Sequence, residues 1–206
     1  MKRITSLHQV IVLILSISLI SCEKNYTVFY EDDDAKDLSV FSDMGNNVMS
    51  CYIDGHPFRT RDRVYKAGFS RGILYPEIEL FKDDSGSDSD TLIINWRADV
   101  LAPNPHSVSV VLVIKKDFTY SDFNDFNNTR FVIDGVNGYF MVDDNRSEKG
   151  TGSIYFHKAI LMPDNTVGVN NQLSGVFEAS LPSFQITRGR FDHTLPVGRR
   201  EGVVFF

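Results

Sequence analysis

Apolar and polar residues alternate along most of the chain after residue 45, in short runs separated by Gly, Asn, Asp and Pro. Successive side chains of a β-strand point to opposite faces, so this period predicts strands that are buried on one side. The clearest run is Thr91–Arg97, in which Leu92, Ile94 and Trp96 share a face. Tyr52–Phe58 contains two short runs joined by an Asp-Gly turn, which is typical of a tight hairpin. The pattern therefore predicts a fold built mainly from antiparallel strands.

Further strands are expected along the same region: Leu74–Phe81, Ser107–Lys115, Gly138–Val142, Gly152–Ile160, Gln172–Leu181, Phe184–Phe191 and Val203–Phe206. A β-bulge at Gly189 is expected to bring Phe191 to the same face as Ile186. One helical turn is expected at Tyr120–Phe126, with Ser121 as its cap. No strand–helix alternation is present. The fold class is therefore all-β, an antiparallel β-sandwich with few or no helices beyond a leader; a lipocalin-like closed barrel is the alternative.

The first 22 residues have the organisation of a secretory signal peptide. Lys2 and Arg3 precede an apolar run, Val10–Ile20, which is shorter than the ~20 residues of a membrane-spanning helix. Leu19-Ile20-Ser21-Cys22 resembles the lipobox of bacterial lipoproteins. This resemblance implies cleavage before Cys22 and attachment of acyl chains such as palmitate to Cys22, which then holds the protein on a membrane.

Three parts follow from these observations: a lipoprotein signal peptide at 1–21, an acidic tether at 22–44 and a single β-rich domain at 45–206. The tether contains Glu31-Asp32-Asp33-Asp34, whose like charges favour an extended, solvated segment. In lipoproteins of Bacteroidetes, an acidic stretch after the lipidated cysteine marks export to the cell surface. That likeness implies an outer-membrane location facing outward, with the periplasmic face as the alternative.

Short motifs in the domain also look like those of uncharacterised Bacteroidetes lipoproteins. They are Ile53-Asp54-Gly55, Leu173-Ser174-Gly175-Val176-Phe177 and Ile186-Thr187-Arg188-Gly189-Arg190-Phe191-Asp192. The resemblance implies a β-sandwich-like lipoprotein domain, and it brings no catalytic residues with it.

The net charge of −6 limits the partners of the chain. Loss of Lys2 and Arg3 with the leader would make the mature protein two units more negative. Phosphate backbones repel such a surface, so nucleic acid is not an expected partner. The expected partners are the membrane, through the lipid anchor, and a glycan or protein ligand.

Two side chains with potential functions are assigned to the core. If Cys22 carries lipid, Cys51 has no partner in the chain and no disulfide is expected. Alternation places Cys51 beside Met49 and Ile53, as a small buried apolar group. The single tryptophan, Trp96, is expected in the core rather than on an exposed sugar-binding platform.

The sequence also contains a hydrolase-like motif and two sets of possible metal ligands. Gly68–Gly72 matches Gly-x-Ser-x-Gly, but a strand follows where hydrolases have a helix, so Ser70 is expected in an ordinary loop. The histidines of the mature chain lie too far apart for a local metal motif; they are His56, His106, His157 and His193. Four aspartates are clustered in the chain: Asp83, Asp84, Asp88 and Asp90. Clustered carboxylates can bind calcium, but these lack the spacing of an EF-hand, so a solvated hairpin tip is expected instead. No catalytic residue, metal or cofactor is assigned.

The sequence thus predicts a non-enzymatic, membrane-anchored extracytoplasmic lipoprotein that binds a ligand or supports an assembly. One alternative is a lipocalin-like carrier with a small apolar ligand inside a barrel. Another is a cryptic hydrolase in which Ser70 meets a histidine and a carboxylate in space.

Overall fold

The computed structural model describes residues 29–60, 63–64, 71–72, 76–83, 88–98, 107–119, 121–160, 171–195 and 203–205. The strands are β1 (Glu31–Asp32), β2 (Ala35–Ser39), β3 (Val48–Ile53), β4 (His56–Arg59), β5 (Arg63–Val64), β6 (Arg71–Gly72), β7 (Glu77–Phe81), β8 (Ser89–Arg97), β9 (Ser107–Lys115), β10 (Thr129–Ile133), β11 (Gly138–Val142), β12 (Thr151–Ile160), β13 (Asn171–Ser180), β14 (Gln185–Leu195) and β15 (Val203–Phe205). Within these ranges the one helix is the 3-10 turn η1 (Ser121–Phe126). No helix of the described residues is long and apolar enough to cross a membrane.

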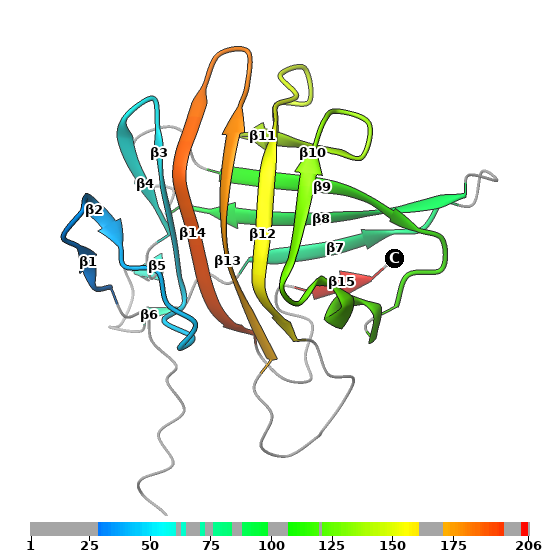
Figure 1. Ribbon diagram of the computed structural model, residues 1–206, viewed down its shortest axis with the longest axis horizontal. Coiled ribbons are helices and arrows are strands. Elements are labelled where there is room, and N and C mark those ends of the chain that lie inside the picture. Colours follow the sequence, from blue (N-terminus) through cyan, green and yellow to red (C-terminus); the bar gives the residue numbers. More distant parts are fainter. Residues whose placement is uncertain are drawn as a thin grey trace, which may run out of the picture.

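Two large sheets form a β-sandwich, which confirms the predicted fold class. One sheet has the order β10-β12-β13-β14-β3-β4 and the other β11-β9-β8-β7-β15. Figure 1 shows β12, β13 and β14 running across the direction of β7, β8 and β9, as in sandwiches with crossed sheets. In both sheets the described pairings are antiparallel, except that β15 pairs in parallel with β7. The closed-barrel alternative is not what the chain adopts in its described part.

One corner of the sandwich joins the two sheets directly. Consecutive strands β10 and β11 belong to different sheets, and the chain returns to the first sheet at β12. At this corner Phe140 and Gly150 exchange two backbone hydrogen bonds of 2.9 Å each. Each sheet also contains one three-stranded meander, β7-β8-β9 in one and β12-β13-β14 in the other.

Aromatic rings from both sheets fill the layer between them. Trp96 is 0% exposed, stacks on Phe177 at a centroid distance of 5.7 Å, and lies 5.0 Å from the Phe191 ring. Full burial of one large apolar side chain stabilises a fold by about 1.5–3 kcal/mol. Cys51 is also fully buried, and burial raises the pKa of its thiol far above the usual range. The expected core positions of Trp96 and Cys51 are confirmed.

The bulge expected at Gly189 is present in β14. The register against both neighbouring strands shifts here, and Arg188 has a positive φ of 51°. A β-carbon on Gly189 would lie 2.6 Å from the ring of Phe177. Because the extra residue restores the alternation, Ile186 and Phe191 both reach the core.

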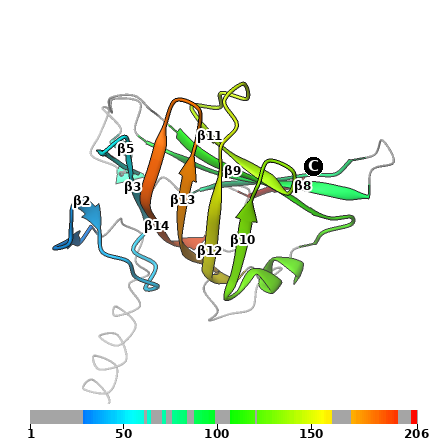
Figure 2. The same cartoon turned by 45° about the horizontal axis from the view of Figure 1, so that its top comes forward.

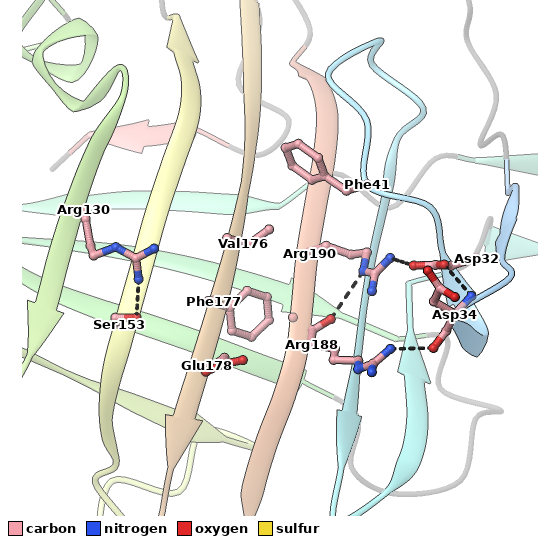
Figure 3. A pocket seen from close by; sticks show the side chains of 11 residues that line it. Asp32, Asp34, Phe41, Arg130, Ser153, Val176, Phe177, Glu178, Arg188 and Arg190 are labelled. Carbon is pink, nitrogen blue, oxygen red and sulfur yellow. Dashed lines mark hydrogen bonds and ion pairs between the residues drawn. The ribbon is translucent and has the colours of Figure 1, made fainter.

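The acidic segment differs from the expected tether over the part that the structure describes. Glu31–Ser39 forms the β1–β2 hairpin, which lies beside β3 and β4 (Figure 1). Figure 2 shows the same hairpin at the side of the sandwich. The hairpin is bonded to Arg190 of β14 (Figure 3). Ala35 and Leu38 of this hairpin are buried, at 1% and 0% exposure. An extended, solvated tether over 22–44 is therefore wrong for these residues, and the folded domain begins before residue 45.

The cap of the helical turn is also different from the expected one. Thr119, not Ser121, takes this position, because its backbone N–H donates to Asp122 Oδ2 at 2.8 Å and its hydroxyl donates to the same oxygen at 2.6 Å. Both bonds run from Thr119 to the carboxylate of Asp122, so the acid three residues later supplies one half of a capping box. Phe123 and Phe126 are buried, as expected.

Candidate functional site

A groove of about 780 Å³ lies on the outer face of the six-stranded sheet, against the β1–β2 hairpin. Figure 3 shows polar side chains on both sides of it and Val176 between them. Three arginines and three acids line the groove: Arg130, Arg188, Arg190, Asp32, Asp34 and Glu178. The groove is open to solvent, so a ligand can enter from the side.

Strand register explains how residues far apart in the sequence reach this groove. Arg130 of β10 pairs with Tyr155 of β12, Tyr155 with Val176 of β13, and Val176 with Arg190 of β14. These four residues form one row across the outer face. Neighbouring strands are 4.7–4.9 Å apart, so the row spans about 14 Å from Arg130 to Arg190.

An ion pair holds the hairpin against the sheet on one side of the groove. Arg190 Nη1 donates to Asp32 Oδ2, and the two side chains are only 11% and 19% exposed. The same guanidinium nitrogen donates to the Ser39 carbonyl at 2.8 Å. The hydrogen bond from Arg190 lowers the pKa of Asp32 below its usual value. Charge-assisted bonds of this kind are stronger than neutral ones, so the hairpin is a fixed wall.

Further hydrogen bonds extend this attachment along the hairpin. The Tyr52 hydroxyl donates to the Lys36 carbonyl at 2.6 Å, and Arg188 Nη1 donates to the Asp34 carbonyl. The hydroxyls of Ser39 and Ser50 share a hydrogen bond of 2.8 Å in a buried position. The groove thus has a wall that is hydrogen-bonded to β3 and β14.

The segment after the hairpin carries Phe41 and is held by a buried acid. Asp192 of β14 is 4% exposed and accepts hydrogen bonds from the backbone N–H groups of Gly45, at 2.8 Å, and Asn46, at 3.0 Å. Lys158 Nζ pairs with Asp43 Oδ2 at 3.0 Å and, chiefly through this contact, lowers the pKa of Asp43. These contacts position the segment next to the sheet.

Four charged groups of the groove keep free bonding capacity. Arg130 donates from Nη1 to the Ser153 hydroxyl at 3.0 Å and lies 5.7 Å from the Tyr155 ring centroid. Among the described residues, neither Arg130 nor Arg188 is in an ion pair, and the carboxylates of Asp34 and Glu178 accept no hydrogen bond. The groove therefore presents both donors and acceptors to a ligand.

A smaller hollow of about 280 Å³ lies on the outer face of the other sheet. It combines apolar side chains such as Ile93 and Phe81 with the ion pair between Arg97 and Glu77, which is 2.9 Å long. Glu79, Asp144 and Arg146 also line this hollow.

Several residues that the sequence singled out lie outside the described residues: Cys22, Ser70, Asp84 and His106. Of the Gly68–Gly72 motif only the backbone of Arg71–Gly72 is described, as strand β6. The hydrolase hypothesis is thus neither supported nor contradicted by geometry. Cys22 likewise stays a prediction.

The acidic cluster after β7 is not a uniformly solvated tip. Asp90 is 1% exposed and accepts hydrogen bonds from the backbone N–H groups of Asp83, at 3.2 Å, and Phe118, at 3.3 Å. Lys116 Nζ lies 3.6 Å from the same carboxylate. The expectation of a solvated position is wrong for Asp90, which joins β8 to the turn after β9. Within the described part of the chain, no three His, Cys, Asp or Glu side chains are grouped to hold a metal.

The described histidines lie in three different environments. His56 is exposed beside the Asp-Gly turn, and His157 contacts Phe41 edge to face at 5.8 Å. His193 is 0% exposed, and neither of its ring nitrogens has a hydrogen-bond partner among the described residues. Burial lowers the pKa of His193 to about 3, so the ring is neutral at pH 7.

Sequence reasoning missed the residues that define the groove. Arg130, Arg188 and Glu178 belong to strands with outward-facing polar positions, which is a signal that the sequence does contain. Their meeting depends on the pairing of β10, β12, β13 and β14, and no local pattern specifies that order.

No known protein family, no curated protein and no solved structure matches this chain. The function is therefore argued from the geometry of the groove and from the N-terminal sequence.

Proposed function

We propose that this chain is a membrane-anchored extracytoplasmic lipoprotein and that its β-sandwich is a non-enzymatic binding module. The groove between the β1–β2 hairpin and β10, β12, β13 and β14 is the binding face. Cys22 is the lipid attachment site, and the domain lies on the outer face of the outer membrane. The observation that carries the binding role is a row of guanidinium and carboxylate groups along one groove, of which Arg130, Arg188, Asp34 and Glu178 are in no ion pair with another described residue.

The dimensions and chemistry of the groove support binding. Ligand sites in proteins have volumes of roughly 300–1,000 Å³ and a few convergent polar groups, and the groove, at about 780 Å³, falls in that range. The serine hydroxyl that lines the groove, on Ser153, accepts a hydrogen bond from Arg130. Among the described residues, no histidine is hydrogen-bonded to this hydroxyl. A nucleophile needs an adjacent base, so this arrangement favours binding over covalent catalysis.

The anchor is supported by the basic residues, the apolar run and the cysteine at the N-terminus, which agree with one another in order and length. Several acyl chains, at about 0.8 kcal/mol per buried methylene, give a stable attachment where one chain is marginal.

One experiment on cells tests both parts of this proposal. Intact cells labelled with palmitate are digested with a protease that cannot enter, and the protein is followed by immunoblot beside a periplasmic control. We expect a labelled protein that is degraded while the control stays intact, and no label on the Cys22→Ala variant.

Two results would contradict the proposal in different ways. Label on the Cys22→Ala variant would refute the anchor. Protection in intact cells, followed by digestion once the cells are permeabilised, would refute the outward orientation and place the domain on the periplasmic side.

A further inference from the structure

We infer that the groove binds a neutral oligosaccharide, with the guanidinium of Arg130 and the carboxylate of Glu178 hydrogen-bonded to sugar hydroxyls. This inference rests on the proposed function, because it names the ligand of the same groove.

The first argument is the charge balance of the groove. Its three arginines are matched by three carboxylates, although the chain as a whole has a net charge of −6. One pair, Arg190 with Asp32, is already neutralised internally. The remaining groups, Arg130, Arg188, Asp34 and Glu178, also sum to zero. A groove of this kind gives no net attraction to an anion or a cation, so a neutral ligand fits it best.

The second argument is the kind of hydrogen bond that the groove leaves unmade. Guanidinium groups only donate and carboxylates only accept, whereas a hydroxyl does both. Arg130 uses one nitrogen on Ser153, and Glu178 accepts no bond among the described residues. Vicinal hydroxyls of a sugar can accept from the first and donate to the second, and planar side chains suit such two-point contacts. A purely apolar ligand would leave these groups desolvated and unpaired.

The third argument is the shape of the surface between the arginines. The floor includes Val176, which Figure 3 shows between Arg130 and Arg190. It also includes Gly189, which has no side chain. Phe41, which is 40% exposed, borders the groove. A low apolar floor with an exposed aromatic ring suits the C–H faces of a pyranose ring. The row of about 14 Å from Arg130 to Arg190 suits more than one sugar unit.

The position on the sheet disfavours a peptide. Peptides that bind by strand addition need an open sheet edge, where backbone N–H and C=O groups are free. The floor strands β12, β13 and β14 are each paired on both sides, so their backbone groups are already used in the ladder. Binding on this face must therefore rely on side chains.

The test uses the full chain purified in detergent. Its binding to a panel of neutral oligosaccharides, uronic-acid oligosaccharides and extended peptides is screened on an array, and positive ligands are measured by calorimetry. Arg130→Ala and Glu178→Ala remove the proposed contacts from exposed positions without a positive φ. Arg146→Ala is the matched control, because Arg146 is exposed near the opposite sheet. Circular dichroism confirms that each variant is folded.

We expect at least one neutral oligosaccharide to bind the native protein. Its affinity should be at least tenfold lower for each groove variant and unchanged for Arg146→Ala. Binding of uronic-acid oligosaccharides or peptides alone would overturn the inference, as would an empty panel or a sugar whose affinity the groove variants do not change. An empty panel with a surface-exposed, palmitate-labelled protein would remove only the sugar ligand. Loss of the anchor or of surface exposure in the cell experiment would remove the proposed function itself.

Discussion

His193 is an ionisable side chain in an otherwise apolar part of the sandwich. It lies opposite Leu173 across the β13–β14 pair, and its neighbours along the inward face of β14 are Phe191 and Leu195, all of them buried. A histidine in such a place can be kept only in its neutral form, because no described group compensates for a buried positive charge. The residue therefore couples folding to pH.

We expect acid to destabilise the protein through His193. The unfolded chain takes up a proton near pH 6.5, whereas burial lowers the pKa in the folded protein to about 3. Stability contributed by the neutral ring is complete above pH 6.5 and is lost as the pH falls from there toward 3, at about 1.4 kcal/mol per pH unit. Urea unfolding at pH 7.0, 6.0 and 5.0 measures this slope.

The control for this prediction is a pair of histidine variants. His193→Leu is expected to reduce the slope between pH 6 and 5, whereas His56→Ala, at an exposed position, is expected to keep it. An unchanged slope in His193→Leu would mean that another group is responsible for the pH dependence.

At the scale of single elements, the β14 bulge connects core packing with the groove. It turns Phe191 inward and leaves Arg188 and Arg190 on the outer face, so the same insertion serves both layers. Gly189 is required because the Phe177 ring occupies the space of a side chain.

Gly189→Ala is expected to destabilise the fold by about 1–3 kcal/mol, as other overpacked core positions do. The added β-carbon would approach both the ring and the carbonyl oxygen of Phe177, each at 2.6 Å. The free energy of unfolding in urea measures the loss. Gly55→Ala is the comparison. A β-carbon at position 55 would meet open space, but Gly55 has a φ of 78°. The substitution should therefore destabilise the fold only through the left-handed backbone conformation, by about 1–2 kcal/mol. A loss well below about 1 kcal/mol for Gly189→Ala would contradict the steric argument.

Local patterns were sufficient for most strands and insufficient for the hairpin. Burial on one face imposes a period of two, which identified β9, β11, β12 and β13 within a residue of their ends. In β1–β2 the acidic residues suggested solvation, but Asp32 is neutralised by Arg190, which lies 158 residues further along the chain. β10 was missed because the exposed Val132, between Phe131 and Ile133, interrupts the alternation of polar and apolar residues. The groove could not be predicted, because it depends on strand order and on this distant ion pair.

At the scale of the whole molecule, the hairpin and the sandwich behave as one unit because of a few contacts. Leu38 supplies the apolar part, and the Asp32–Arg190 pair supplies the polar part. If the pair is broken, one charge stays partly buried without its partner.

Arg190→Ala is therefore expected to destabilise the protein by about 1–3 kcal/mol and to loosen the hairpin. Hydrogen exchange of the amides of residues 31–39 should become faster, while that of β8 and β9 stays slow. A double-mutant cycle with Asp32→Ala separates the pair from other effects of each truncation. A coupling energy near zero, or equal exchange in Arg190→Ala and the native protein, would show that the pair does not hold the hairpin.

Under the proposed lipid anchor, the docked hairpin would also limit how far the domain can stand from a lipid surface. With the proposed anchor at Cys22, the chain from Cys22 to Phe29 connects the lipid to the first described residue of the domain. Seven residues at 3.3–3.6 Å each span at most about 25 Å. An acidic tether that stayed extended to residue 44 would have allowed about three times that height. The groove would then lie close to the lipid headgroups. Slender, flexible polymers could enter the space above the headgroups, whereas bulky folded particles would contact the bilayer before they reach the groove.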